Sequence, residues 1–324
     1  METLLVWLGA ILLDLWLGDP SSWLHPVQVM GWLINALTQK GLKLFQPGWP
    51  RKLGGALMSL TVIGASAVAA GLTVALAQTI NPYFGLALEI IGLASCLAGQ
   101  SLAAAVQGVL EAVNQQDLSL ARRRLAYFVG RDTESLNETD ILRAALESLA
   151  ENTVDGATAP FFYALLGSFL PGVGPLPLAF AYKAASTLDS MVGYRREPYA
   201  DWGWFSARLE DGLTWLPCRL TVLILALLSR RPRQVLALCR RDAPQDPSPN
   251  SGWSEGVYAA VLGVRLGGEN VYQGEVKHKP FLGEPRRPLT PALVREGLTL
   301  SRSALGGFLG LGLLGWALGR LIFL

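Results

Sequence analysis

The chain is poor in charge. Asp, Glu, Lys and Arg make up only 16% of its 324 residues, whereas a typical soluble domain has about 25%. No charged residue occurs in the 36 residues of 53–88 or in the 27 residues of 156–182. A run of about 18 or more such residues is long enough to cross ~30 Å of hydrocarbon as a helix. The sequence therefore predicts an integral membrane protein.

Other absences narrow the possible chemistry. The three cysteines lack metal-like spacing and are predicted to be buried, inert thiols, and the two histidines lie far apart in the chain. There is no G-x-x-x-x-G-K-[ST], so any nucleotide must be held by another kind of cradle. Gly310-x-Gly312-x-x-Gly315 matches a dinucleotide fingerprint, but it lies in an apolar run with no preceding strand, and helix packing explains it better. A net charge of +2 does not indicate a nucleic-acid partner.

The uncharged runs predict the membrane helices. Residues 3–18 form a first apolar segment, 53–78 and 83–110 a hairpin of two spans, and 212–229 and 303–319 two further segments. The piece 156–182 contains four prolines, which disfavour an unbroken helix, so we expect a broken or re-entrant element there. The total is four to six spans.

Two polar segments separate these runs. Residues 111–155 read as soluble helices, with Ser135-x-x-Glu138 as a possible capping box, and 230–302 is basic and rich in Pro and Gly. The positive-inside rule places both segments on the cytoplasmic side. The predicted fold class is all-α, a polytopic integral membrane protein with a broken or re-entrant helix. Residues 1–324 are predicted to form a single membrane-embedded domain.

The strongest candidate site is a run of carboxylates. Glu147, Glu151 and Asp155 are four residues apart, so a continuous helix would place all three on one face. Like charges so placed repel unless a cation or solvent relieves them, and Mg²⁺ favours such oxygens. A solvated acidic face is the alternative, although unneutralised carboxylates are costly next to a membrane element.

Three weaker groups complete the candidates. Lys183 and Asp189 follow the broken element and would approach the carboxylates if both of its ends share one membrane face; the alternative for Lys183 is an interfacial lysine. Gly130-Arg131-Asp132-Thr133, together with Arg208 and Asp211, supplies groups that bind phosphates, although a solvated turn has the same composition. The turn-rich segment with Asn250 and Trp253, followed by Arg265, is either a binding surface or a connector.

In combination these segments resemble the CobD/CbiB family of cobalamin biosynthesis, over nearly the whole chain. The matching motifs, in chain order, are Leu13-Asp14, Gly18-Asp19-Pro20, His25-Pro26 through Gly31, Gly130-Arg131-Asp132-Thr133, Glu147-Ser148-Leu149-Ala150-Glu151-Asn152-Thr153 with Asp155-Gly156, Tyr182-Lys183-Ala184, Thr187-Leu188-Asp189-Ser190-Met191-Val192-Gly193-Tyr194, Ala207-Arg208 with Asp211, Pro247-Ser248-Pro249-Asn250, Gly252-Trp253, and Leu262-Gly263-Val264-Arg265-Leu266-Gly267-Gly268. Glu210 stands where the family pattern has Asp, which keeps the charge.

The resemblance implies an adenosylcobinamide-phosphate synthase: an amide ligase dependent on ATP and Mg²⁺. It would join a propionate carboxylate of adenosylcobyric acid to 1-amino-2-propanol phosphate or a related amino alcohol. For this reaction we hypothesise the following roles: metal ligands Glu147, Glu151 and Asp155; catalytic residues Lys183, Asp189 and Arg131; nucleotide-binding residues Arg131, Asp132, Thr133, Asn152 and Lys183; and substrate-binding residues Arg195, Arg208, Asp211, Asn250, Trp253 and Arg265.

Two other functions stay open at this point. A membrane prenyltransferase also places acidic helical motifs over Mg²⁺-diphosphate, and a non-catalytic sensor or assembly subunit would use 230–302 as a docking surface. The expected partners are the corrinoid, the amino-alcohol phosphate and membrane lipid, with a second copy of the chain or other cobalamin-assembly enzymes as further candidates. The expected location is the inner cell membrane, with the site on its cytoplasmic side.

Overall fold

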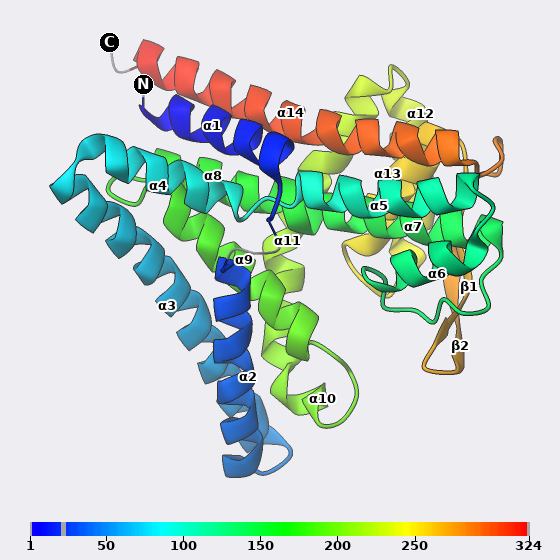
Figure 1. The fold of residues 1–324 in the computed structure, drawn as a ribbon, viewed down its shortest axis with the longest axis horizontal. Coiled ribbons are helices and arrows are strands. Elements are labelled where there is room, and N and C mark those ends of the chain that lie inside the picture. The colour runs from blue at the N-terminus through cyan, green and yellow to red at the C-terminus, as the bar shows by residue number, and fades with distance from the viewer. Residues whose placement is uncertain (1, 21–23, 323–324) are drawn as a thin grey trace. The chain divides into compact units, whose positions relative to one another are not determined.

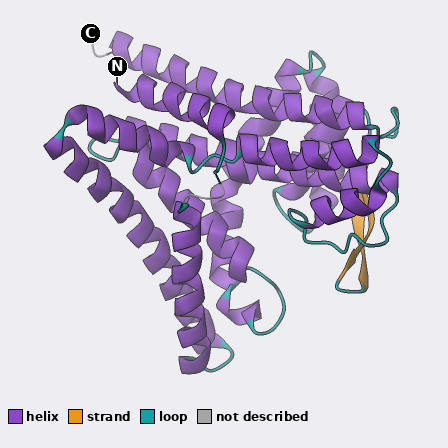
Figure 2. Ribbon diagram, in the orientation of Figure 1, coloured by secondary structure: helices purple, strands orange, loops and turns teal. Residues whose placement is uncertain are grey.

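A computed structural model describes residues 2–20 and 24–322, most of which are helical (Figures 1 and 2). The chain divides into two compact units. Unit 1 comprises residues 1–98, 159–214 and 311–324, and unit 2 comprises 99–158 and 215–310. Unit 1 contains the helices α1 (Glu2–Leu17), α2 (Pro26–Leu44), α3 (Trp49–Ile80), α4 (Pro82–Ala94), α8 (Ala159–Phe169), α9 (Pro175–Val192) and α10 (Tyr199–Trp202).

Unit 2 contains the polar segments. Its elements are α5 (Gly99–Asn114), α6 (Leu118–Ala126), α7 (Glu138–Thr153), a π-helical turn (Val154–Thr158), α12 (Pro232–Asp242), a 3-10 turn (Ala243–Gln245), α13 (Ser251–Leu262), β1 (Arg265–Tyr272) and β2 (Glu275–Gly283). Two long helices, α11 (Trp204–Leu228) and α14 (Pro291–Ile322), each contribute residues to both units.

The prediction of an all-α membrane protein is confirmed. Four segments of the described chain are long and apolar enough to span a bilayer: Trp49–Ile80, Pro82–Asn114, Trp204–Leu228 and Pro291–Gly319. Many of their large apolar side chains are exposed, as expected where lipid rather than protein surrounds a helix. Within α14, added Cβ atoms at Gly312 and Gly315 would meet Leu165 and Phe169, so these glycines serve helix packing, as predicted.

The second arm of the predicted hairpin is not one helix. The sequence predicted a continuous span over 83–110, but α4 ends at Ala94 and α5 begins at Gly99. At the end of α4 the Ser95 hydroxyl donates to the Gly92 carbonyl at 2.7 Å, and the next two backbone N–H groups bond three residues back rather than four. Local hydrogen bonding by a serine side chain competes with the helical ladder, which is the physical reason for the break.

The broken element lies where the prolines predicted it. Helix α8 ends at Phe169 and α9 begins at Pro175, after a turn that contains Gly172 and Gly174, both with positive φ. The two helices pack against each other, and the Tyr163 and Tyr182 rings stack at 5.1 Å. Because Tyr163 lies in the second turn of α8, the hairpin returns Lys183 to the level at which α8 begins.

Two further details differ from the predictions. Helix α7 is capped by Asn137, whose side chain accepts from Asp140 N at 3.0 Å, rather than by Ser135. The basic segment 230–302 is folded and includes an antiparallel hairpin, with Leu266 opposite Leu282 and a register irregularity at 266–268. The sequence did not predict these strands, because their glycines and charged residues hide the alternation that marks a strand.

Candidate functional site

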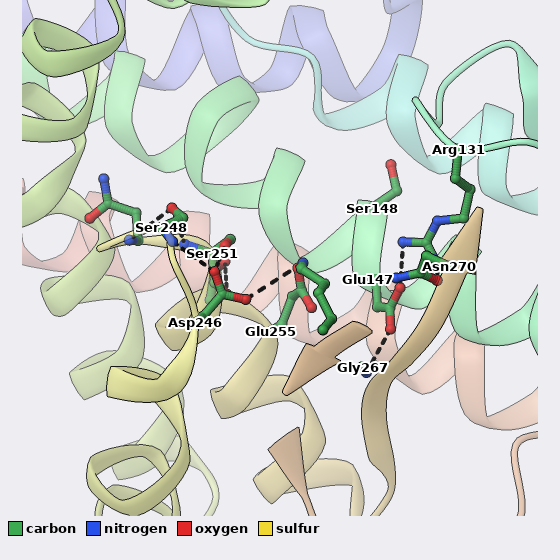
Figure 3. A network of polar contacts seen from close by, with 12 residues as sticks. Arg131, Glu147, Ser148, Asp246, Ser248, Ser251, Glu255, Gly267 and Asn270 are labelled. Atoms are coloured by element: carbon green, nitrogen blue, oxygen red, sulfur yellow. Dashed lines mark hydrogen bonds and ion pairs between the residues drawn. The ribbon is translucent and has the colours of Figure 1, made fainter. Parts of the chain in front are cut away.

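A buried polar centre in unit 2 surrounds Glu147. Its side chain on α7 is only 2% exposed, and Oε2 pairs with Arg131 Nη2 at 2.5 Å. Oε1 pairs with Arg143 Nη1 at 3.3 Å and accepts from Gly267 N of β1 at 2.8 Å (Figure 3). A buried carboxylate needs partners of this kind, because the loss of hydration is costly.

The same two arginines fasten the hairpin to α7. Asn270 Oδ1 on β1 accepts from Arg131 Nη1 at 2.7 Å and from Arg143 Nη1 at 3.0 Å. Arg143 also donates to the carbonyls of Gly267 and Glu269. Burial tends to lower the pKa of Arg131, but the Glu147 carboxylate more than offsets this, so the pKa is raised and the guanidinium stays charged.

The three predicted metal ligands have different environments. Glu147 is occupied by the two arginines, whereas Glu151, one turn further along α7, is exposed. Asp155 is half-buried and lies in the π-helical turn, where the helical register changes. No three His, Cys, Asp or Glu side chains of the described chain gather as a metal site. Glu147 does not fit a metal ligand, whereas Glu151 and Asp155 remain accessible.

The predicted phosphate-binding loop makes contacts within the protein. Asp132 accepts from the N–H groups of Gln273 and Gly274 at the tip of the hairpin, at 3.1 and 2.8 Å. Thr133 donates to the Arg122 carbonyl at 3.1 Å. Asn152 donates to the carbonyl and the hydroxyl of Ser148 at 2.9 and 3.1 Å. Asp132 and Thr133 therefore hold the loop in place, whereas Asn152 bonds within α7. The sequence signal for phosphate binding is equally a signal for loop structure.

A second buried group joins β2 to α13. Lys279 Nζ pairs with Glu255 Oε1 at 2.5 Å and lies 3.8 Å from Asp246 Oδ2. The Glu255 side chain is fully buried, and its Oε2 accepts no hydrogen bond from the described residues. Asp246 accepts from Ser248 N and Ser251 Oγ, which orders the loop before α13 (Figure 3).

Burial is the main cause of an unusually high pKa of the Glu255 carboxyl. It raises the pKa of Glu255 to about 8; Lys279 opposes the shift, and the charges of Glu147 and Glu151 add to it. The pKa of Lys279 is raised as well: burial would lower it, but the carboxylates around it prevail. A carboxyl that titrates near neutral pH in a polar centre is a candidate for proton transfer.

An arginine placed between two indoles lies beside the loop. The Arg219 guanidinium lies 5.1 Å from the centre of the Trp215 ring and 4.6 Å from that of Trp253. It donates to Asn250 Oδ1 at 3.2 Å and to the Pro249 carbonyl at 2.8 Å. The structure thus brings together Asn250 and Trp253, two residues predicted to bind substrate, and adds an arginine between them. Such a stack presents a flat, cationic surface.

The remaining predicted residues are placed differently. Arg265 stacks on Phe281 across the hairpin, at 4.3 Å. Lys183, Asp189, Arg195, Arg208 and Asp211 all belong to unit 1, Lys183 and Asp189 on α9, and Arg208 and Asp211 on one face of α11. Arg195 and Arg208 are exposed, and Lys183 is half-buried. The predicted proximity of Glu151 and Lys183, which lie in different units, stays a prediction.

Sequence reasoning missed several members of the polar centre. Arg143 lies four residues before Glu147 on α7, a spacing typical of an ion pair within a helix, and this signal was overlooked. Asn270, Asp246, Glu255 and Lys279 come from separate elements and have no recognisable spacing to their partners. The signal available among these was Glu255, a lone carboxylate in the otherwise uncharged run 251–262 that forms α13. A charge isolated in a buried helix needs a partner elsewhere in the chain.

Comparisons with known proteins cover nearly the whole chain. A family model described as CobD/Cbib protein matches residues 7–301. Cobalamin biosynthesis protein CobD of Synechocystis sp. is 57% identical over 295 residues, 91% of this chain and 86% of that protein. CobD of Yersinia enterocolitica is 40% identical over 306 residues, 93% and 94% of the two chains, and CbiB of Salmonella typhimurium is 42% identical over 293 residues, 89% of each. No solved structure matches.

Proposed function

Because the chain belongs to the CobD/CbiB family and so has a role in cobalamin biosynthesis, we propose that it is the membrane amide ligase that completes the adenosylcobinamide phosphate side chain. The reaction joins a propionate carboxylate of adenosylcobyric acid to 1-amino-2-propanol phosphate at the expense of ATP. The observation that carries this proposal is the family match over residues 7–301, which includes the polar centre and the loop before α13.

The chemistry requires activation of the carboxylate, which is a poor electrophile. In the proposed first step a carboxylate oxygen attacks the γ-phosphorus of ATP, and the bond from that phosphorus to the ADP oxygen breaks. The amine then forms the C–N bond as the C–O bond of the acyl phosphate breaks, which releases phosphate and one proton. Positioned cations stabilise the charge that develops on the transferred group.

The environments of the side chains refine the assigned roles. Arg131 is 7% exposed and paired with Glu147, so the proposal keeps Lys183 as the cation at the phosphates. Glu151 and Asp155 would hold Mg²⁺, because this ion is commonly bound by one or two carboxylates plus substrate phosphates. The bound ion would neutralise polyphosphate charge. Asp189 is proposed to accept the ammonium proton, and Arg195 or Arg208 to bind the phosphate of the amino alcohol.

The substrate surface is proposed to lie at Arg219. The stack of Trp215, Arg219 and Trp253 is flat and cationic, which suits a large ring that carries carboxylate and amide groups. The proposed location is the inner cell membrane with this surface on the cytoplasmic side, where ATP is available.

The deciding experiment is reconstitution. Purified protein with adenosylcobyric acid, 1-amino-2-propanol phosphate and ATP-Mg²⁺ is expected to give a product with the mass of the amide and one ADP per product. Release of AMP would replace the acyl phosphate by an adenylate. Release of pyrophosphate from an isoprenoid donor, without a corrinoid, would favour a prenyltransferase, and no turnover under any condition would favour a sensor or assembly subunit.

A further inference from the structure

A pocket in unit 1 is lined by none of the residues proposed to act in ligation. It has a volume of about 540 Å³, and its walls come from α3, α4, the α8–α9 turn and the start of α9. The residues that line it are Gly71, Val74, Ala75, Gln78, Glu89, Gly172, Val173, Gly174 and Pro177. This volume falls within the range of small-ligand sites. Most of the lining is apolar or glycine, so Glu89 and Gln78 supply its polar side chains.

Glu89 is the only charged side chain between Lys52 and Glu111. It lies on α4, in the apolar segment Pro82–Asn114, and no described residue forms an ion pair or side-chain hydrogen bond with it. A Cβ built on Gly174 would lie 3.3 Å from Glu89 Oε1, so the carboxylate rests against the bare backbone of the α8–α9 turn. An ionisable side chain inside a membrane segment is costly unless a partner neutralises it.

The depth of the pocket indicates what surrounds it. Glu89 is seven residues from Pro82, where α4 begins, a distance of roughly 10 Å along a helix. At that tip Tyr83 is 80% exposed and Phe84 48%. Exposed aromatic rings at the end of a spanning helix are typical of the membrane–water interface. The pocket therefore lies at the level of lipid headgroups and upper acyl chains.

From these observations we propose that the pocket binds a primary ammonium group on a short polar stem, with Glu89 as its anion. An ethanolamine phospholipid presents such a group at this depth, and a free amino alcohol has the same chemistry. Gln78 can accept a further hydrogen bond from the ammonium or donate one to the stem. The glycines of the walls leave room for the headgroup. The proposal does not depend on the ligase activity.

The test is lipid binding by native mass spectrometry of the delipidated protein. Dioleoyl phosphatidylethanolamine is titrated in competition with the phosphatidylcholine of the same chains. The wild-type protein is expected to favour the ethanolamine lipid about tenfold, a difference of about 1.4 kcal/mol, because a trimethylammonium group has no N–H to donate. Glu89→Gln is expected to reduce the preference to less than about twofold.

Two further variants keep the result interpretable. Ala75→Phe fills the pocket without changing charge and is expected to lower retention of the lipid. Glu111→Gln removes an exposed carboxylate on α5 and should bind as the wild type does. Competition by millimolar ethanolamine would identify a soluble amine as the ligand; its absence would identify the lipid. Equal binding of the two lipids by the wild type, or an unchanged preference in folded Glu89→Gln, would overturn the proposal.

Discussion

At the scale of single residues, two glutamates one helical turn apart have different environments. Glu147 is buried between Arg131 and Arg143, whereas Glu151 is exposed. The spacing that places them on one face of α7 is visible in the sequence. The arginines that occupy only one of them come from a loop and from the preceding turn of α7, and which glutamate they reach depends on the packing of the hairpin.

The pairing of Glu147 predicts a stability defect. Arg131→Met leaves a buried carboxylate without its 2.5 Å partner, and breaking such a pair costs about 3–5 kcal/mol. The measurement is the free energy of unfolding in detergent, with Arg123→Met on the exposed face of α6 as the control. Wild-type stability with lost turnover would instead return Arg131 to a catalytic role.

The exposed glutamate predicts an activity defect. Glu151→Gln and Lys183→Gln are each expected to lower the rate of ligation by at least about 10²-fold, because the first removes a proposed ligand of Mg²⁺ and the second removes the cation proposed to stabilise the transferred phosphoryl group. Stability and membrane insertion should be unchanged. Glu138→Gln, at the exposed start of the same helix, is the matched control. A fully active Glu151→Gln would remove the proposed Mg²⁺ site.

At the scale of elements, α13 and β2 meet through a carboxyl of raised pKa. Glu255 has a pKa of about 8 in the folded protein, against an ordinary value of 4.5. Between these values the folded state binds a proton that the unfolded state has lost. The contribution to stability is therefore complete below about pH 4.5 and is lost as the pH rises through about 8.

The raised pKa of Glu255 predicts a measurable dependence of stability on pH. The unfolding temperature of the wild type is expected to fall between pH 5 and about pH 8, and Glu255→Gln should make this part of the profile flatter, because the amide does not titrate. The control is Glu275→Gln, a change at an exposed position of β2. A wild-type profile that rises with pH would contradict the assigned pKa.

The contact between α11 and the loop before α13 predicts a binding defect. Arg219→Lys keeps the charge but loses the planar group that stacks between Trp215 and Trp253 and donates to Asn250 and Pro249. If this surface binds the corrinoid, the KM for the corrinoid should be about tenfold higher in Arg219→Lys than in the wild type, with little change in kcat. Arg233→Lys on the exposed face of α12 is the control. An unchanged KM would place the corrinoid elsewhere.

At the scale of the whole molecule, the distribution of charge predicts the orientation in the membrane. The positive-inside rule places the 111–155 segment in the cytoplasm and the neutral Asn81-Pro82 turn outside. All three native cysteines are buried, and burial raises the pKa of Cys239 to about 12, so they should react slowly with maleimides.

The labelling of introduced cysteines can therefore report on which side of the membrane a segment lies. Asn81→Cys is expected to react with an impermeant maleimide in intact cells. Gln115→Cys, in the exposed turn after α5, should react only after lysis if the predicted cytoplasmic placement of this segment holds. Labelling of both positions in intact cells, or the reverse pattern, would contradict the proposed topology.

Much of the fold could be predicted from the sequence, because the hydrocarbon of the membrane restricts the structures that a spanning segment can adopt. Hydrocarbon forces apolar stretches into internally bonded helices, so the spans and the break at 170–174 followed from missing charges and placed prolines. The break at Ser95 was not visible, because a serine in an apolar run is compatible with a continuous helix. The strands at 265–283 were hidden for the same reason: local composition was ambiguous.

The sequence by itself determined that this protein lies in a membrane, that many of its basic residues gather in two segments between the apolar runs, and to which family it belongs. Only the tertiary structure decided which polar groups meet. In the folded chain Glu147 is paired with Arg131 and Arg143, whereas Glu151 is exposed. Glu255 is paired with Lys279, which lies 24 residues further along the chain. The physical reason is that hydrophobicity acts locally along the chain, whereas the partner of a buried charge is set by how distant elements pack.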